Sequence, residues 1–306
     1  IYYYSLAAKQ NHAGAQFNLG VIYGTGKLVP INIERAIYYY TLAANQNHAD
    51  AQFNLGYIYD TGKNVPVDTV KAIHYYSLAA NQNLSAAQYI LGIFYYLKNY
   101  SISNMKKSVF YIVLASKNGN REANFGHGFL LHEGKYIKRD IPAAVHYLKE
   151  ASSFNNQFAK NNLGILYKHG FGEDVPQRIS QSIEYFEEAI RQKKDYLSMY
   201  NLSLIYFYDR NVQSNFDSLD LLIKSSKMFN ESLMLLCLVL VQKYDSDLVK
   251  IMTNLEKRID VSSDLLSKIK NSIIKCNLLN PKSFDLFCKF YRERDYLYDI
   301  LHRPIL

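Results

Sequence analysis

The sequence predicts an all-α fold, a solenoid of helix–turn–helix repeats, and three observations support this prediction. The chain repeats itself with a period of 36 residues. Each period contains two segments whose apolar residues have helical spacing. Residues that favour helix ends recur with the same period. About six such units fit before the pattern is lost near residue 228.

The repeat is clearest in the first 72 residues. Residues 1–36 and 37–72 are identical at 25 of 36 positions, which a tandem array explains. Later periods drift but keep two small residues, namely Ala15, Ala51, Ala87, Ala123 and Ala159, and Gly20, Gly56, Gly92, Gly128 and Gly164. Because glycine inside a helix costs about 1 kcal/mol relative to alanine, its recurrence predicts that two helices approach closely at this point.

The first helix of each period is best seen in the second unit. Ala51, Leu55 and Tyr59 recur at i, i+4 and i+8, on one face of a helix. Gly62 suits the left-handed position just past a helix end, and Pro66 prevents the helix from continuing. We therefore predict a helix over Ala51–Tyr59.

The second helix of the unit follows a capping residue, Asp68. Ile73, Tyr76 and Ala80 form its apolar stripe. This pattern predicts a helix over Thr69–Asn81, antiparallel to the first.

The two kinds of helix boundary recur along the chain. The predicted caps of the second helices are Asn32, Asp68, Asn104, Asp140 and Asn215. The predicted left-handed residues after the second helices are Asn11, Asn47, Asn83, Gly119 and Asn155.

The period is lost after about Phe229. Segments 230–243, 245–259, 262–278 and 281–301 still have helical patterns. We divide the chain into a repeat solenoid over 1–228, whose first residues complete a preceding unit, and a divergent terminal repeat with a helical cap over 229–306. A separate C-terminal domain is the alternative.

The charge leaves a nucleic-acid function open. The net charge is +8 and the pI is about 9.1, which is typical of proteins that bind DNA or RNA. However, the sequence contains no run of five Lys or Arg residues. It also contains no apolar span of 18 residues, so we expect no membrane segment.

No set of residues in the sequence is typical of catalysis. Gly26-Lys27 lacks the flanking residues of a phosphate-binding loop. His127 and His132 are five residues apart, which does not give the i, i+4 spacing of helical zinc ligands. We therefore expect no enzymatic activity, no metal, no cofactor and no small-molecule substrate.

These motifs resemble the Sel-1-like repeat, a family related to the tetratricopeptide repeat. In the second unit the matching residues are Ala51, Leu55, Gly56, Tyr59, Gly62, Pro66, Asp68, Lys71, Ala72, Tyr75, Tyr76, Ala79 and Ala80. Tyrosine stands where many members carry tryptophan, and the resemblance covers residues 1 to about 228. It implies a right-handed α/α superhelix that scaffolds protein complexes.

The chain begins inside a repeat, since Ile1 aligns with Ile37 in a second helix. We therefore expect a longer protein with upstream repeats or another domain. Resembling proteins of protists with this Asn- and Tyr-rich composition often carry a protein kinase domain ahead of such repeats. By analogy, the repeats would regulate a linked kinase.

Polar residues recur on the first helices, which line the concave surface of a solenoid. One column contains Gln16, Gln52, Gln88 and Asn124, and a second contains Asn18, Asn54, Asn162 and Asn201, with Phe17 and Phe53 beside them. An amide both donates to and accepts from a peptide backbone. We interpret these residues as the lining of a groove for extended peptides; a solvated helix face is the alternative.

The sequence thus predicts a cytoplasmic scaffold or adaptor whose partners are other proteins or extended peptides. A basic helical-repeat protein that binds nucleic acid is the alternative. The family resemblance also allows a membrane-associated quality-control scaffold.

Overall fold

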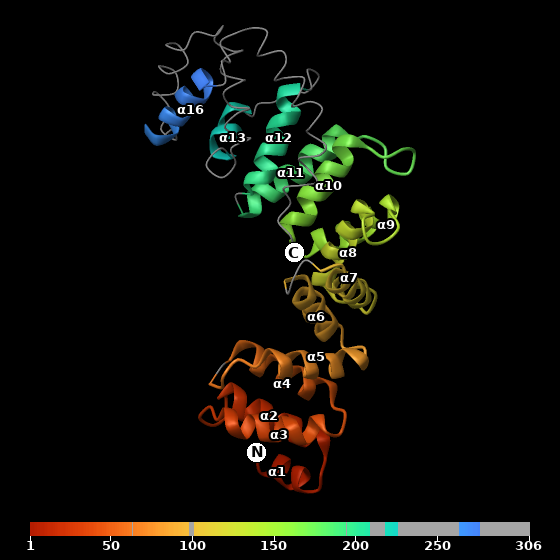
Figure 1. The fold of residues 1–306 in the computed structure, drawn as a ribbon, viewed down its shortest axis with the longest axis vertical. Coiled ribbons are helices and arrows are strands. Elements are labelled where there is room, and N and C mark those ends of the chain that lie inside the picture. Colours follow the sequence, from red (N-terminus) through yellow and green to blue (C-terminus); the bar gives the residue numbers. More distant parts are fainter. Residues whose placement is uncertain (63, 98–100, 194, 209–217, 226–262, 276–306) are drawn as a thin grey trace. The chain divides into compact units, whose positions relative to one another are not determined.

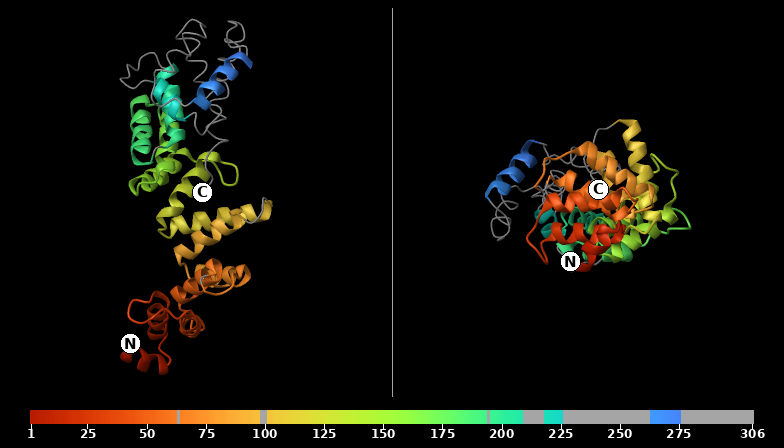
Figure 2. Two further views of the ribbon diagram at one scale, coloured as in Figure 1. Left: turned by 90° about the vertical axis from the view of Figure 1, so that its left-hand side faces the viewer. Right: turned by 90° about the horizontal axis from the view of Figure 1, so that it is seen from below.

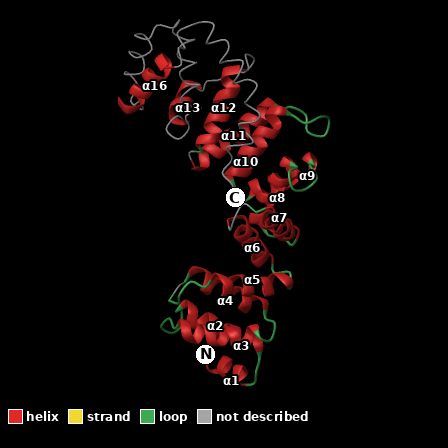
Figure 3. Cartoon of the chain, in the orientation of Figure 1, coloured by secondary structure: helices red, strands yellow, loops and turns green. Residues whose placement is uncertain are grey.

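The computed structural model describes residues 1–62, 64–97, 101–193, 195–208, 218–225 and 263–275. The regular elements in these ranges are α-helices, apart from an isolated bridge between Phe171 and Val175 (Figure 3). The all-α repeat fold predicted from the sequence is confirmed. The chain divides into two compact units, residues 1–139 and 140–305.

The first unit contains consecutive helix pairs (Figures 1 and 2). Its helices are α1 (Tyr2–Lys9), α2 (Ala13–Thr25), α3 (Ile33–Ala44), α4 (Ala49–Thr61), α5 (Thr69–Asn81), α6 (Ser85–Leu97), α7 (Ile102–Lys117) and α8 (Arg121–Glu133). In three of these repeats the first helix packs most extensively on the second helix of the same repeat: α2 on α3, α4 on α5 and α6 on α7. The helices predicted over Ala51–Tyr59 and Thr69–Asn81 are therefore confirmed as α4 and α5.

The second unit continues the same pairing in the residues that the structure describes. Its helices are α9 (Ile141–Ser153), α10 (Gln157–His169), α11 (Ile179–Lys193), α12 (Tyr196–Tyr208), α13 (Ser218–Ser225) and α16 (Ser263–Lys275). α10 packs on α11, and α12 packs on α13. Most of the C-terminal region 229–306 lies outside the described residues, so the boundary at residue 228 remains a prediction.

Side chains cap the second helices as the sequence predicts at three positions. Oδ1 of Asn32, Asp68 and Asp140 accepts a hydrogen bond from the backbone N–H three residues later, at 2.9, 3.0 and 3.0 Å. The prediction for Asn104 is wrong. Ser101 caps α7 instead, because this helix begins one turn earlier, and its hydroxyl accepts from the Asn104 N–H at 3.2 Å. Asn215 lies outside the described residues.

The turns after the second helices have the predicted left-handed backbone. The φ angles are 63°, 60°, 63°, 82° and 63° at Asn11, Asn47, Asn83, Gly119 and Asn155. At Asn47 this conformation turns the next N–H back onto the helix, so that His48 donates to the carbonyl of Ala43 at 3.1 Å. The backbone groups at the helix end are thereby satisfied.

The glycines at the centre of the first helices lie against large side chains of the second helices. A Cβ atom added to Gly56 would lie 2.7 Å from Cδ1 of Tyr76, and one added to Gly20 would lie 2.5 Å from Cδ1 of Tyr40. Ile112 approaches Gly92 in the same way. The close approach predicted from the recurrence of these glycines is confirmed.

Candidate functional site

The first unit contains an open groove between α2, α3 and α4, with a volume of about 410 Å³. Its lining residues come from all three helices: Val21, Gly24, Thr25, Ile33, Tyr40, Asn54, Tyr57 and Ile58. These three helices lie in the red and orange part of Figure 1. None of the eight lining residues carries a charge at neutral pH, so the groove suits an uncharged, largely apolar segment.

Two small residues open the groove on its α2 side. Val21 and Gly24 line it, whereas the next repeat has the larger Tyr57 and Asp60 at the equivalent positions. There the Tyr76 hydroxyl lies 3.5 Å from Oδ2 of Asp60. The two repeats, which are otherwise nearly identical, therefore differ in side-chain size at these two positions.

The polar side chains that line the groove include the Tyr40 phenol and the Asn54 amide. Burial raises the pKa of Tyr40 above its usual value, and a hydrogen bond with the Asn54 side chain opposes this shift. Tyr40 is therefore a neutral hydroxyl at physiological pH. Together the two side chains offer donors and acceptors in a mostly apolar setting, an arrangement typical of sites that orient a ligand.

The second predicted column contributes Asn54 to the groove. Asn18, its equivalent one repeat earlier, is half-buried. Asn162 and Asn201 are buried in the second unit, where Asn162 donates to the Phe158 carbonyl at 2.8 Å and Asn201 to Oδ1 of Asn161 at 3.0 Å. Of the four residues in this column, only Asn18 and Asn54 therefore have side-chain surface that a partner could reach.

The first predicted column is not an exposed surface, because its side chains are buried. In Gln16, Gln52 and Gln88, Nε2 donates to the carbonyl eight residues earlier, at 3.3, 3.1 and 3.1 Å. Their Oε1 atoms accept from the side-chain amide 30 residues later, at 2.7, 2.6 and 2.9 Å. We name this set of bonds the amide clamp. It joins the first helix of one repeat to the preceding second helix and to the turn that follows the next second helix, so its residues are structural.

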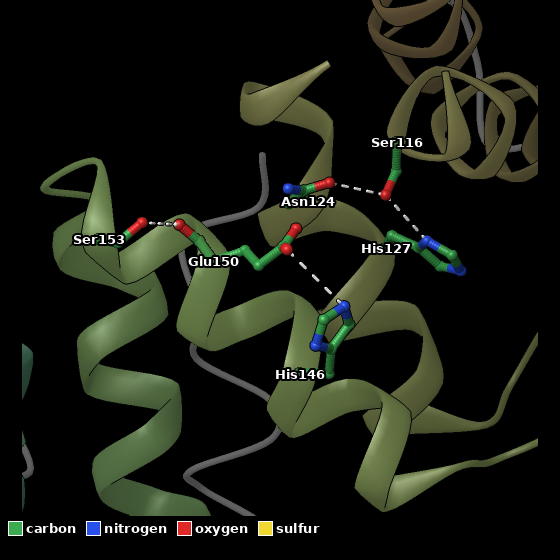
Figure 4. A network of polar contacts seen from close by, with 6 residues as sticks. All are labelled: Ser116, Asn124, His127, His146, Glu150 and Ser153. Atoms are coloured by element: carbon green, nitrogen blue, oxygen red, sulfur yellow. Dashed lines mark hydrogen bonds and ion pairs between the residues drawn. The ribbon is translucent and has the colours of Figure 1, made fainter. Parts of the chain in front are cut away.

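The equivalent position in the fourth first helix has a different arrangement. The hydroxyl of Ser116 donates to Oδ1 of Asn124 at 2.8 Å and lies 3.0 Å from Nδ1 of His127 (Figure 4). All three side chains are buried. Burial, together with the charge of Lys117, lowers the pKa of His127 to about 4, so the imidazole is neutral at pH 7. Asn124 is therefore also an interior residue.

The two predicted phenylalanines are half-buried and pack between helices. The Phe17 ring stacks on His48 with a centroid distance of 4.7 Å, and the Phe53 ring lies 5.5 Å from that of Tyr76. Both pack against the buried clusters of neighbouring repeats. Contact between these rings and a partner remains a prediction.

The sequence reasoning missed Val21, Gly24 and Tyr57 as groove residues. The available signal was the short set of differences between residues 1–36 and 37–72, which includes Val21 against Tyr57 and Gly24 against Asp60. The amide clamp was also missed, because buried residues and exposed residues recur with the same period of 36 residues.

The described residues contain no group of three His, Cys, Asp or Glu side chains arranged to hold a metal ion. Within the same ranges, no helix is both long enough and apolar enough to cross a bilayer.

The Sel1 repeat family model matches the chain at seven segments, residues 1–12, 13–48, 49–84, 85–120, 121–153, 157–194 and 197–218. The segments follow the observed helix pairs; 49–84, for example, spans α4 and α5. Comparison with curated proteins gives no match.

The solved structures that share the fold include the following two. One is c5321, a protective antigen of uropathogenic Escherichia coli with an SLR fold; the TM-score is 0.65 at 23% identity, over 95% of this chain and 64% of that one. The other is a Sel1 repeat protein from Oxalobacter formigenes, with a TM-score of 0.54 at 26% identity, over 71% of this chain and 86% of that one. The chain thus spans less than two thirds of the length of c5321.

Proposed function

The chain belongs to the Sel1 repeat family, and from this premise we propose that it is a scaffold that binds other proteins through the groove between α2, α3 and α4. Proteins of this family are typically scaffolds for protein–protein interactions, and their repeat fold is non-catalytic. Stacked helix pairs present the side chains of successive first helices along one surface. The observation that carries the proposal is the groove itself, which has apolar walls and the Asn54 amide among its lining residues.

The chemistry of the groove favours an extended peptide with an apolar side chain. Ile33, Ile58 and Tyr57 provide apolar surface for that side chain. The Asn54 amide can both donate to and accept from the peptide backbone. Each such hydrogen bond contributes about 0.5–1.5 kcal/mol.

The proposal is tested by closing the groove. Gly24→Leu places a large side chain in it, and a Cβ atom at Gly24 makes only ordinary contacts, at 3.5 Å from Ala36 Cβ and 3.6 Å from the Tyr40 hydroxyl. The parent chain and this variant are compared as baits for proteins from the source cells. We expect the variant to lose specific partners while its melting temperature changes little.

A matched control and a second variant make the result interpretable. Tyr38→Ala alters a side chain that is 59% exposed and does not line the groove, so its partners should be unchanged. Asn54→Ala should weaken the same partners that Gly24→Leu loses. Capture of identical proteins by the parent and by both groove variants would show that the binding surface lies elsewhere.

Two finer parts of the proposal have tests of their own. Control of a linked kinase is tested by comparing kinase activity with and without the repeats. A cytoplasmic location is tested by imaging the tagged protein in its own cells.

A further inference from the structure

The first unit repeats one further constellation that the groove does not use. In three consecutive repeats, a tyrosine near the end of the first helix stacks on a tyrosine of the second helix, and a cation lies over the first ring. The members are Tyr23, Arg35 and Tyr39; Tyr59, Lys71 and Tyr75; and Tyr95, Lys107 and Tyr111. We name this set the basic–tyrosine ladder.

The geometry of the ladder is nearly the same at each step. The stacked rings have centroid distances of 5.8, 6.0 and 5.9 Å and interplanar angles of 3°, 6° and 5°. The cations lie 5.3, 5.1 and 5.1 Å from the centroid of the first ring. The cation and the second tyrosine are at i and i+4, and therefore on one face of the second helix.

The charged groups of the three ladder cations remain available to a ligand. All three residues are exposed. Within the described ranges, no carboxylate forms an ion pair with Arg35 or Lys107, and only Lys71 has one, with Asp68 at 3.2 Å. Both side chains of that pair are accessible to solvent, with exposed fractions of 57% for Lys71 and 34% for Asp68. Ion pairs exposed in this way are weak.

Contact with the rings holds the cations in place before any ligand binds. A long basic side chain that lies on an aromatic ring keeps its charged group in water while its position is restricted. Less conformational freedom is then lost when a ligand binds. Arg35 is held further by a hydrogen bond of 3.4 Å from Nη1 to the Tyr23 hydroxyl.

We propose that the basic–tyrosine ladder is a docking surface for an acidic, extended segment of a partner protein, with one carboxylate bound per repeat. Successive cations lie on α3, α5 and α7, which are joined in the packing by α4 and α6. Two packed-helix steps of about 8–10 Å each set an upper limit of about 20 Å between successive cations. Because an extended chain advances about 3.3 Å per residue, the ladder fits a segment whose acidic residues lie up to about six positions apart. The site lies outside the groove, so the proposal stands independently of the function proposed above.

A peptide fits the ladder better than a nucleic acid does. Bases bind to proteins by stacking on aromatic faces, but each first ring of the ladder is already engaged by a second ring and a cation. DNA carries one phosphate per about 1.7 Å of duplex. The ladder offers only one cation per repeat, so its cations are spaced much more widely than the phosphates they would have to bind.

The test measures binding of the full chain to a fluorescent oligoglutamate peptide, with oligoglutamine and single-stranded oligothymidylate as comparison probes. The triple variant Arg35→Gln, Lys71→Gln, Lys107→Gln removes the three charges. The control Lys9→Gln, Lys117→Gln, Lys138→Gln removes three charges from exposed residues of the same unit outside the ladder. We expect the ladder variant to bind oligoglutamate about tenfold more weakly, since three exposed ion pairs together account for about one decade. The control should stay within about twofold of the parent.

A charge-retaining variant separates binding from folding. Arg35→Lys, Lys71→Arg, Lys107→Arg should bind oligoglutamate like the parent, and thermal unfolding of each variant reports whether the fold is kept. Equal losses in the ladder variant and the control would show that only the overall charge matters and would overturn the proposal. Tighter binding of oligothymidylate than of oligoglutamate, with the same dependence on the ladder, would assign the surface to nucleic acid instead.

Discussion

At the scale of single residues, one buried amide in each of three repeats determines how neighbouring helix pairs meet. Gln52 bonds to the Ala44 carbonyl behind it and to the Gln82 amide ahead of it. A buried amide without such partners would be costly. The recurrence of this residue in the sequence therefore reflects packing between repeats, although it has the same period as a binding column would have.

Replacing Gln52 with alanine should destabilise the first unit. The substitution removes both bonds of the clamp, and we expect a loss of about 1–3 kcal/mol in the free energy of unfolding. The loss should lie near the lower limit, because the Ala44 carbonyl still accepts from the Asn47 N–H at 2.9 Å. Chemical denaturation measures the change. Asn45→Ala is the control, and it should cost less than about 0.5 kcal/mol because this exposed amide lies outside the clamp. Equal losses in both variants would contradict a structural role for the buried amide.

His127 should make stability depend on pH in a defined window. Burial lowers its pKa from 6.5 to about 4 in the folded chain, so the unfolded chain binds a proton more readily between these values. The stabilising effect of the neutral imidazole is thus complete above about pH 6.5 and is lost as the pH falls towards 4. Unfolding of the parent and of His127→Gln across this range measures it. We expect the parent to lose more stability on acidification, and parallel curves would refute the assignment.

At the scale of helices, the recurring glycine determines how closely the two helices of a repeat pack. Gly56 has no Cβ, and the Tyr76 ring occupies the space that one would need. The sequence predicts this approach because a glycine in a helix is unfavourable unless packing compensates for it.

Replacing Gly56 with alanine should therefore destabilise the chain despite the better helix propensity of alanine. The added methyl group would lie 2.7 Å from Cδ1 of Tyr76, and overpacking of this kind typically costs about 1–3 kcal/mol. The matched control is Gly24→Ala in α2, where the methyl group has room, so stability should hold or rise by up to about 1 kcal/mol. Thermal unfolding of the two variants compares them. Similar melting temperatures would count against the close approach of α4 and α5.

The start of α7 shows the limit of reasoning from periodicity about helix boundaries. Asn104 lies at the capping position of the repeat, yet the helix begins at Ile102 because Ser101 provides a hydroxyl one turn earlier. Both residues can cap a helix. The choice between them depends on the local backbone, which drift of the repeat has altered here.

At the scale of the whole molecule, the chain should have no enzymatic activity of its own. Its Sel1 repeats account for most of the sequence, and this repeat fold is a non-catalytic scaffold. Assays of the purified chain with hydrolase and transferase substrates should give only background rates. Turnover that a single substitution abolishes would contradict this expectation.

The tandem sequence by itself determined the fold class, the helix pairs and the left-handed turns. The reason is local: propensity, capping and glycine conformation act within a few residues and repeat with them. Thus α4, α5 and the turn at Asn47 could be predicted from one repeat. Membership of the family follows from the same local pattern.

Only the tertiary structure decided which recurring polar residues face inward. Gln16 and Asn18 are two positions apart on one helix and recur with the same period, yet Gln16 is buried in the clamp and Asn18 is half-exposed. Whether each of these side chains is buried depends on how the next helix pair packs against this helix. The spacing of residues within one helix does not contain that information. The groove likewise required the packed neighbours, because its volume depends on how Val21 and Gly24 of one helix meet Asn54 and Tyr57 of another.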